Sequence, residues 1–252
     1  MIEVIQTELL KYRRTFMRKL ILLAPLFFVL YALPQKLFMP PDYFREWQSV
    51  LNLVYNWWPV LFIPLGIALV ASLVSALERK AGNYRSLLAC PVSPAKIWLG
   101  KIVVMAIYLF VSTLVLMAAT LLSGWLTAEG ATPWFEIIVG GLTIWLTSLA
   151  CLPIQLWAAT WKGTVCSMAL GLVGLIVGVI AAPKAYWVVV PWSWPIRLMC
   201  PIIGVHPNGT LLEATDPLLE ASVIPIGIMV SLFSLIFLTG VTAAWFSRRE
   251  VH

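Results

Sequence analysis

The chain of 252 residues is 61% hydrophobic and only 11% charged, with a formal net charge of +6 and a mean hydropathy of +0.93. Soluble domains carry about a quarter charged residues, so this composition excludes an ordinary soluble protein and predicts a multi-pass membrane protein. The four cysteines and two histidines are scattered and contain no Cys-x-x-Cys pair, so we expect neither a metal site nor a disulfide framework.

Residues 1–19 have the pattern of an amphipathic helix. Apolar side chains recur at spacings of three and four residues from Ile2 to Phe16, whereas Glu3 and Glu8 fall on other faces. Because several basic residues close this segment, we expect it to lie in the inner headgroup layer of the membrane. A secretory signal peptide is disfavoured, since the basic segment is long and periodic and further apolar segments follow.

Six later segments are apolar over the roughly 20 residues that a bilayer-spanning helix needs. They are Leu20–Met39, Trp57–Leu77, Ile102–Leu126, Ile137–Trp161, Gly163–Ala182 and Val223–Phe246. Lys162 is the only charged residue between Ile137 and Ala182, so Lys162-Gly163 predicts a tight turn between two spans. The predicted fold class is an all-α membrane protein, with residues 20–252 forming a six-span transmembrane domain.

The basic residues are unevenly distributed between the two sides of these spans. Thirteen of the 17 Lys and Arg residues fall on one side, and only Lys36, Arg45, Lys184 and Arg197 fall on the other. Positive charge resists translocation, so the first side is predicted to be cytoplasmic. This places both termini in the cytoplasm, and we expect the protein to lie in a bacterial cytoplasmic membrane.

The segment Glu78–Lys101 is a short polar insert that carries five basic residues and one acid. Asn83 is a suitable N-cap for a short helix over Tyr84–Cys90, and Pro91 would end that helix. The pattern predicts a short helix held across the inner face of the membrane. A solvated connecting loop is the alternative that the pattern alone leaves open.

The segment Pro183–Ser222 is predicted to lie outside and is apolar over its first half. Pro191, Pro195 and Pro201 interrupt it, so it cannot form one straight spanning helix. Such a segment can enter the outer leaflet and return if protein surrounds its backbone polar groups. The sequence His206-Pro207-Asn208-Gly209 then predicts a tight turn.

Catalytic and ion-coupling motifs are missing from the sequence. There is no GxxxxGK[ST] phosphate-binding loop, so the chain is not expected to hydrolyse ATP, and it has no motif of a membrane enzyme. The interiors of the six predicted spans contain no Asp, Glu, His or Arg, which disfavours a secondary transporter or channel. Gln155 suits a hydrogen bond between helices better than a transport path, and the small residues Gly171, Gly174 and Gly178 predict close helix packing.

Two stretches carry a family resemblance, LERKAGNYRSLLACPVSPAKIWLGK (Leu77–Lys101) and PWSWPIRLMCPIIGVHPNG (Pro191–Gly209). With the amphipathic start and the six spans, the chain resembles the membrane subunits of ABC-2 type exporters, which have the fold of type V ABC exporters. More narrowly, it resembles the permeases of lantibiotic self-immunity transporters. The first stretch is similar to the family's cytoplasmic coupling region and the second to its outer re-entrant segment.

The resemblance implies a transport subunit without an ATPase site of its own. It implies two copies of a cytoplasmic ABC ATPase, which hold the ATP and Mg²⁺, and a second permease that is either identical or related. The exported substrate would be a lantibiotic-type peptide, or alternatively a lipid, a glycan or another drug-like amphiphile. No nucleic acid partner and no directly bound cofactor are expected.

The resemblance also implies roles for particular residues. Contact with the ATPases would fall on Glu78, Arg79, Tyr84, Arg85, Leu87 and Leu88. The residues on the outer, substrate side would be Trp192, Trp194, Pro195, Arg197, His206 and Asn208. We expect the outer segment to form an aromatic lip over the mouth of the path between two permeases, or alternatively to be anchored by its tryptophans in the headgroup layer.

Overall fold

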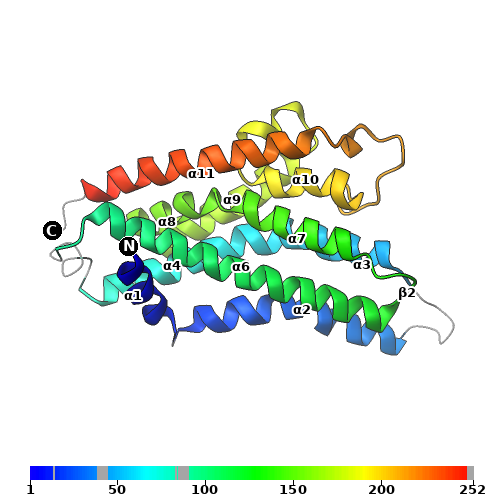
Figure 1. The fold of residues 1–252 in the computed structure, drawn as a ribbon, viewed down its shortest axis with the longest axis horizontal. Helices are drawn as coiled ribbons and strands as arrows, with labels where there is room; N and C mark the ends of the chain where they lie inside the picture. The colour runs from blue at the N-terminus through cyan, green and yellow to red at the C-terminus, as the bar shows by residue number, and fades with distance from the viewer. Residues whose placement is uncertain (14, 39–44, 83, 85–90, 249–252) are drawn as a thin grey trace.

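The computed structural model describes residues 1–13, 15–38, 45–82, 84 and 91–248, most of which are helical (Figure 1). The α-helices are α1 (Ile2–Tyr12), α2 (Phe16–Phe38), α3 (Trp47–Trp57), α4 (Ile63–Lys80), α6 (Pro94–Thr127), α7 (Trp134–Ser148), α8 (Cys151–Lys162), α9 (Thr164–Ala181), α10 (Ser193–Ile203) and α11 (Val223–Ser247). The shorter elements are the π-helix η1 (Trp58–Phe62), the 3₁₀-helices η2 (Ala185–Val189) and η3 (Pro217–Leu219), and the strands β1 (Arg45–Glu46) and β2 (Ala128–Glu129), which pair in parallel.

The predicted all-α membrane fold is confirmed. In the described part of the chain, five helices are long and apolar enough to span a membrane, and the bent pair α7–α8 makes a sixth candidate. The fourth predicted span, Ile137–Trp161, is not one straight helix, because α7 and α8 meet at an angle of 43°. Pro153 explains the bend, since it cannot donate a backbone hydrogen bond to Leu149 and its ring crowds that carbonyl.

The second span differs from its prediction at the outer end. The predicted span begins at Trp57, but α3, η1 and α4 form one continuous helical segment, Trp47–Lys80. The buried side chains of α3 include Val50, Leu51, Val54 and Tyr55, which repeat with the helical period. This apolar face packs into the bundle, so the segment becomes helical before the predicted start of the span.

The predicted break at Lys162-Gly163 is confirmed. Helix α8 ends at Lys162, α9 begins at Thr164, and Gly163 between them has a φ of 90°. A residue with a side chain rarely adopts this backbone conformation, which explains why glycine stands at the turn.

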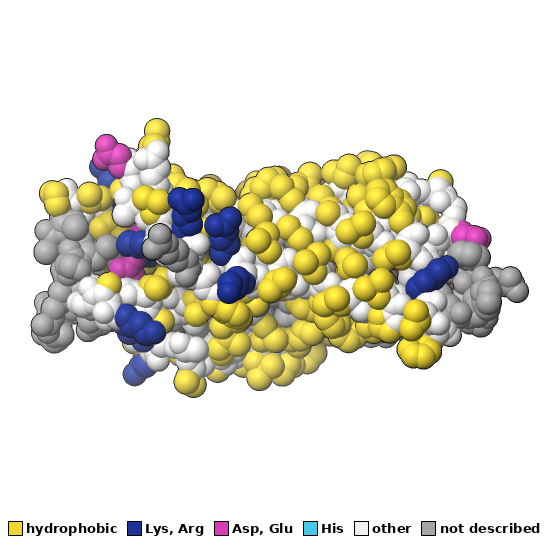
Figure 2. Space-filling view, turned by 90° about the horizontal axis from the view of Figure 1, so that it is seen from below, with side chains coloured by type: hydrophobic (Ala, Val, Ile, Leu, Met, Phe, Trp, Pro, Cys, Tyr) yellow, Lys and Arg dark blue, Asp and Glu magenta, His cyan; other side chains and the backbone are white. Residues whose placement is uncertain are grey.

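The long helices run side by side along the long axis of the molecule (Figure 1). Helix α1 and the last turns of α11 lie at one end, whereas α10 and the connection from α10 to α11 lie toward the other. Figure 2 shows Lys and Arg side chains gathered at the end that holds α1, next to a broad hydrophobic middle. Because α1 and the last turns of α11 lie at the same end, the structure agrees with a topology that has both termini on one side of the membrane. That this side is the cytoplasm stays a prediction.

Helix α10 explains how the proline-rich outer segment is accommodated. It has only 11 residues, about 16 Å at 1.5 Å per residue, which is too short to span a bilayer. It packs against α7, α3, α9 and α11, and every residue from Ser193 to Cys200 is buried. The segment is therefore enclosed by its own chain at the end opposite α1.

Candidate functional site

Four charged side chains meet at the end of the bundle that holds α1. The ammonium of Lys101 lies 3.0 Å from both carboxylate oxygens of Glu8 and also contacts Glu78. The ammonium of Lys11 lies 2.7 Å from one carboxylate oxygen of each acid. Glu8, Glu78 and Lys101 are buried, and Lys11 is partly exposed. We call these four residues the charge cluster.

Helix α1 is held against the start of α6 by contacts on either side of the cluster. A Cβ atom at Gly100 would lie 2.7 Å from Cγ1 of Val4, so any larger residue would force Val4 to shift. One helical turn beyond Glu8, the Tyr12 hydroxyl donates a 2.8 Å hydrogen bond to the Glu8 carboxylate. The Tyr12 ring packs against Tyr108, with the two ring centroids 6.2 Å apart.

The charges of the cluster balance, with two carboxylates and two ammonium groups. Burial alone would lower the pKa of Lys11, but its hydrogen bonds to Glu78 and Glu8 outweigh that effect and raise the pKa. Burial raises the pKa of Tyr12 well above its ordinary value, with the Glu8 carboxylate adding to the effect. Lys11 is therefore protonated and Tyr12 neutral at physiological pH, so the hydroxyl of Tyr12 remains a donor to Glu8.

The cluster joins three separate parts of the chain. Glu78 belongs to the last turn of α4 and Lys101 to the beginning of α6, the two helices on either side of the predicted coupling segment, while Glu8 and Lys11 belong to α1. Arg85, Leu87, Leu88 and most of the predicted short helix lie outside the described residues.

The helical pattern predicts that Glu8 lies on a face of α1 away from its apolar side, and Lys101 is one of the five basic residues of the predicted coupling segment. The structure buries both side chains inside the bundle. A single acid in an otherwise basic loop, and another acid in a basic amphipathic helix, are the signals that suggest such pairing.

Tyr84 ties the coupling segment to the other half of the bundle. It has a positive φ of 68°, which costs about 1–3 kcal/mol for a residue with a side chain, and it is buried. Its hydroxyl lies 3.0 Å from Ser75 Oγ and 3.5 Å from Thr160 Oγ1, and its ring packs edge-on against Phe246. Tyr84 therefore connects α4, α8 and α11.

Arg79 also contacts its own chain. Its guanidinium donates a 3.2 Å hydrogen bond to the carbonyl oxygen of Ala159 in the last turn of α8, and it lies against Gly163. The positive charge complements the exposed carbonyl groups at the C-terminal end of that helix. Arg79 thereby joins the ends of α4 and α8.

The outer tryptophans contact the protein rather than forming an open aromatic surface. Trp194 is 1% exposed, and its indole nitrogen donates a 3.0 Å hydrogen bond to the carbonyl oxygen of Val188. Trp192 packs on Gly174 and Gly178, where added Cβ atoms would lie 2.5 Å and 2.9 Å from atoms of Trp192. The ring of Trp194 is thus unavailable to a ligand, contrary to the expected lip.

The remaining outer residues also hold the segment together. Arg197 is buried and donates a 2.7 Å hydrogen bond to the carbonyl oxygen of Leu218, and Pro195 is buried in the first turn of α10. Asn208 Oδ1 accepts hydrogen bonds from the backbone and hydroxyl of Thr210, while the carbonyl oxygen of His206 accepts one from the amide of Gly209. The predicted tight turn at residues 206–209 is present.

A row of amides on α3, which the sequence analysis missed, anchors this outer turn. Gln48, Asn52 and Asn56 follow one another at intervals of four residues along one face of the helix. Their side-chain nitrogens donate to backbone carbonyl oxygens within residues 203–209. The regular spacing of three amides was the available signal.

The other predicted packing residues join α4, α8 and α9. A Cβ atom at Gly171 would lie 2.8 Å from Ala68 Cβ and 2.9 Å from the carbonyl oxygen of Pro64, so α9 packs closely on α4. Gln155 is fully buried in α8, and its amide lies 3.0 Å from Ser167 Oγ in α9. This contact matches the hydrogen bond between helices that was predicted for Gln155.

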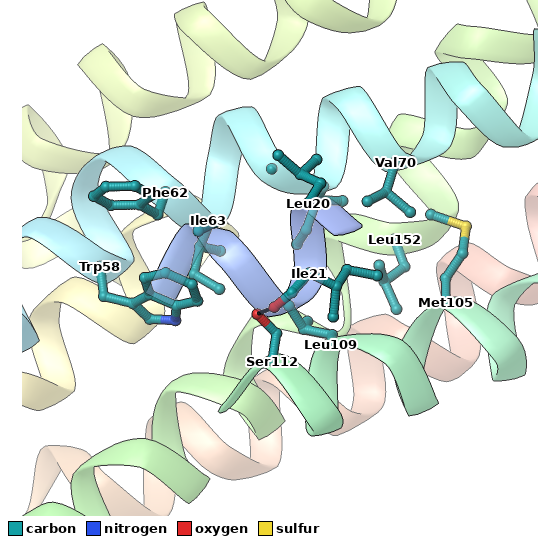
Figure 3. Close-up of a pocket in the computed structure, with 13 residues that line it drawn as sticks. Leu20, Ile21, Trp58, Phe62, Ile63, Val70, Met105, Leu109, Ser112 and Leu152 are labelled. Atoms are coloured by element: carbon teal, nitrogen blue, oxygen red, sulfur yellow. Dashed lines mark hydrogen bonds between the residues drawn. The ribbon is translucent and has the colours of Figure 1, made fainter. Parts of the chain in front are cut away.

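A small apolar cavity of about 50 Å³ lies among α2, η1, α4, α6 and α8 (Figure 3). Aliphatic and aromatic side chains such as Ile21, Phe62 and Leu109 line it. The indole nitrogen of Trp58 is buried without a hydrogen-bond partner among the described residues, and the Ser112 hydroxyl donates to the carbonyl oxygen of Ile21. The cavity offers space for a small apolar group but no catalytic arrangement.

Comparison with known proteins agrees with this architecture. The family model described as ABC-2 family transporter protein matches residues 4–178, which is more than half of the chain and includes most of α1, the charge cluster and the small-residue face of α9. No curated protein and no solved structure matches the chain. Members of this family are membrane subunits of ABC transporters and work with separate ABC ATPase subunits. The chain belongs to the ABC-2 family of transporter proteins.

Proposed function

We propose that the chain is the permease of an ABC exporter that removes a lantibiotic-type peptide from the membrane of the cell that makes it. Two copies of a cytoplasmic ATPase would bind at the end that holds the charge cluster, and a second permease, identical or related, would complete the path. The family match supports the role of a permease, and the sequence resemblance over Leu77–Lys101 and Pro191–Gly209 supports the peptide substrate.

The charge cluster is the observation that carries this proposal. The ATPases would act on the segment between α4 and α6. Glu78 lies in the last turn of α4 before that segment, and Lys101 lies about two turns into α6 after it. Because the two side chains are bound to each other and to Glu8, a force on the segment would move α1, α4 and α6 together. Tyr84 would pass the same movement to α8 and α11.

The predicted outer segment, Pro183–Ser222, would form a fixed cap, and the substrate would leave beside it. Trp194 and Arg197 fix α10 to the rest of the outer segment, so the segment keeps its shape when helices move below it. A substrate leaving between two permeases would pass the outside of this cap. The burial of Trp194 therefore favours a role in holding the outer segment in place. Selection of the peptide would depend on side chains that face the second permease.

The test is to delete the gene in a peptide-producing host and to measure survival against the host's own peptide and export of labelled peptide. The proposal predicts lost resistance, restored by the wild-type chain and not by the Lys101→Met variant. The Lys96→Met variant is the matched control, because Lys96 is an exposed lysine near the start of α6. Unchanged peptide resistance with a changed lipid or glycan content of the outer surface would instead favour the alternative substrate.

A further inference from the structure

A polar cavity lies at the outer end of the bundle, between α2 and α3. Its volume is about 340 Å³, and residues of α2, of α3 and of the outer turn line it. The lining includes Gln35, Arg45, Ser49, Asn52 and Asn56, so polar groups predominate in a chain that is otherwise largely apolar. None of these groups is needed for the coupling described above.

The polar groups of the cavity are arranged around one cation. Arg45 donates a 2.7 Å hydrogen bond to Gln35 Oε1 through one guanidinium nitrogen, which fixes the guanidinium between the two helices. A guanidinium has five N–H donors, and among the described residues Gln35 is the side-chain partner that occupies one of them. The fork geometry of the other donors matches a phosphate. Ser49, an exposed residue in the first turn of α3, adds a hydroxyl to the lining.

Asn52 supplies the complementary acceptor. Its side-chain nitrogen donates a 2.8 Å hydrogen bond to the carbonyl oxygen of Gly209, which fixes the orientation of the amide. Its Oδ1 is buried and has no hydrogen-bond partner among the described residues. An unpaired buried acceptor is costly, so a ligand that donates an N–H or O–H to it would be favoured.

Aromatic side chains lie on the membrane side of this cavity. Tyr31 and Trp57 line it, and the ring of Phe27 stacks between them with centroid distances of 6.0 Å and 6.5 Å. All three rings are partly exposed to the surroundings of the bundle. Tyr and Trp favour the interface between hydrocarbon and headgroups, so this end of the cavity suits the glycerol and upper acyl region of a lipid.

We propose that this cavity binds the headgroup of a phospholipid whose phosphate pairs with Arg45 and whose amine or hydroxyl donates to Asn52. Phosphatidylethanolamine and phosphatidylglycerol have such a donor, whereas phosphatidylcholine has a phosphate but no headgroup donor. The bound lipid would tie the outer end of α2 to α3 and to the turn at residues 206–209. The proposal concerns a resident lipid and does not depend on which substrate is exported.

The test is native mass spectrometry of the full-length chain in detergent, titrated with each of the three lipids. A hydrogen bond from the charged amine of phosphatidylethanolamine contributes enough to change affinity about tenfold, and one from the neutral hydroxyl of phosphatidylglycerol changes it about threefold. We therefore expect both lipids to bind more tightly than phosphatidylcholine, by about these factors. Equal binding of phosphatidylcholine would overturn the proposal.

Variants localise the site and control for misfolding. Arg45→Ala is expected to weaken the two preferred lipids by about tenfold, whereas Arg45→Lys keeps the cation and is expected to lose at most about threefold. Lys184→Ala removes another exposed cation that is predicted to lie outside, and should change nothing. The proposal is wrong if Arg45→Ala binds like Lys184→Ala, or if Arg45→Lys loses as much as Arg45→Ala while both unfold at the wild-type temperature.

A photoreactive residue at Ser49 identifies the occupant in cells. A phospholipid adduct is the expected product, because this exposed side chain lies on the lining of the cavity. An adduct with a polypeptide and none with lipid would overturn the proposal and would make the cavity a contact site for the substrate or a partner protein.

Discussion

Glu8 and Lys101 form a buried ion pair across 93 residues of sequence, in which the ammonium lies 3.0 Å from both carboxylate oxygens. Removing either charge alone would leave the cluster with an unbalanced charge in a poorly hydrated place, although Lys11 would still pair with Glu8 and Glu78 with Lys101. Because Glu78 and Lys11 complete the cluster, α1 is bound to the adjacent ends of α4 and α6 by charge as well as by packing.

Replacing Lys101 with Met should destabilise the protein by about 3 kcal/mol, the lower end of the cost of breaking a buried ion pair, because two carboxylates would then share Lys11 alone. Lys96→Met should change stability by about 0.5 kcal/mol or less, because Lys96 is exposed. Denaturant titration in detergent micelles measures both. If the two variants unfold at the same denaturant concentration, the cluster contributes nothing to stability.

A second change in the cluster should partly rescue the first. The double variant Lys101→Met with Glu78→Gln removes one charge of each sign and restores neutrality, so it should be more stable than Lys101→Met alone. A double-mutant cycle measures the coupling, which we expect to be about 1–3 kcal/mol. Additive losses from the two single variants would show that the residues do not interact.

Gly100→Ala should push α1 away from α6 and cost about 1–3 kcal/mol, because its methyl group would lie 2.7 Å from Val4. Val4→Ala in the same chain should recover most of that loss. Gly66→Ala in α4 is the control, since no atom lies within 4 Å of its added Cβ, and it should be neutral or slightly stabilising. A loss at Gly100 that Val4→Ala leaves unchanged would contradict the packing described.

Trp194→Ala should lower assembly, basal ATPase activity and peptide resistance together, because the ring is buried and its loss costs about 3–5 kcal/mol. Trp134→Ala removes an exposed tryptophan from the first turn of α7 and should leave all three properties intact. If Trp194→Ala assembles and hydrolyses ATP normally but loses resistance, the prediction is wrong and the ring contacts the substrate.

The spans and their break points could be predicted because they depend on local composition. Apolar length identified the spanning segments, and Lys162-Gly163 marked the turn between α8 and α9. Pro153 is equally evident in the sequence, but whether the segment bends at α7–α8 also depends on how the neighbouring helices pack against it. The helical start at Trp47 was missed because polar amides alternate with its buried apolar residues.

The charge cluster and the outer segment were harder to predict because their partners are distant in sequence. Amphipathic periodicity assigns Glu8 to a polar face, and only the fold brings Lys101 and Glu78 to that face. Tryptophan is common at membrane interfaces, so composition favoured an exposed Trp194, whereas the fold of η2 and α10 buries it. Both errors arise from tertiary contacts that local patterns do not encode.

The central claim is that the charge cluster transmits the action of the ATPases to the spans. Its most direct test is the number of peptides exported per ATP hydrolysed, measured in liposomes with intact complexes of wild type, Lys101→Met and Lys96→Met. Lys101→Met complexes should hydrolyse ATP but export about tenfold fewer peptides per ATP, while Lys96→Met should match wild type. A wild-type ratio in assembled Lys101→Met complexes would contradict the claim.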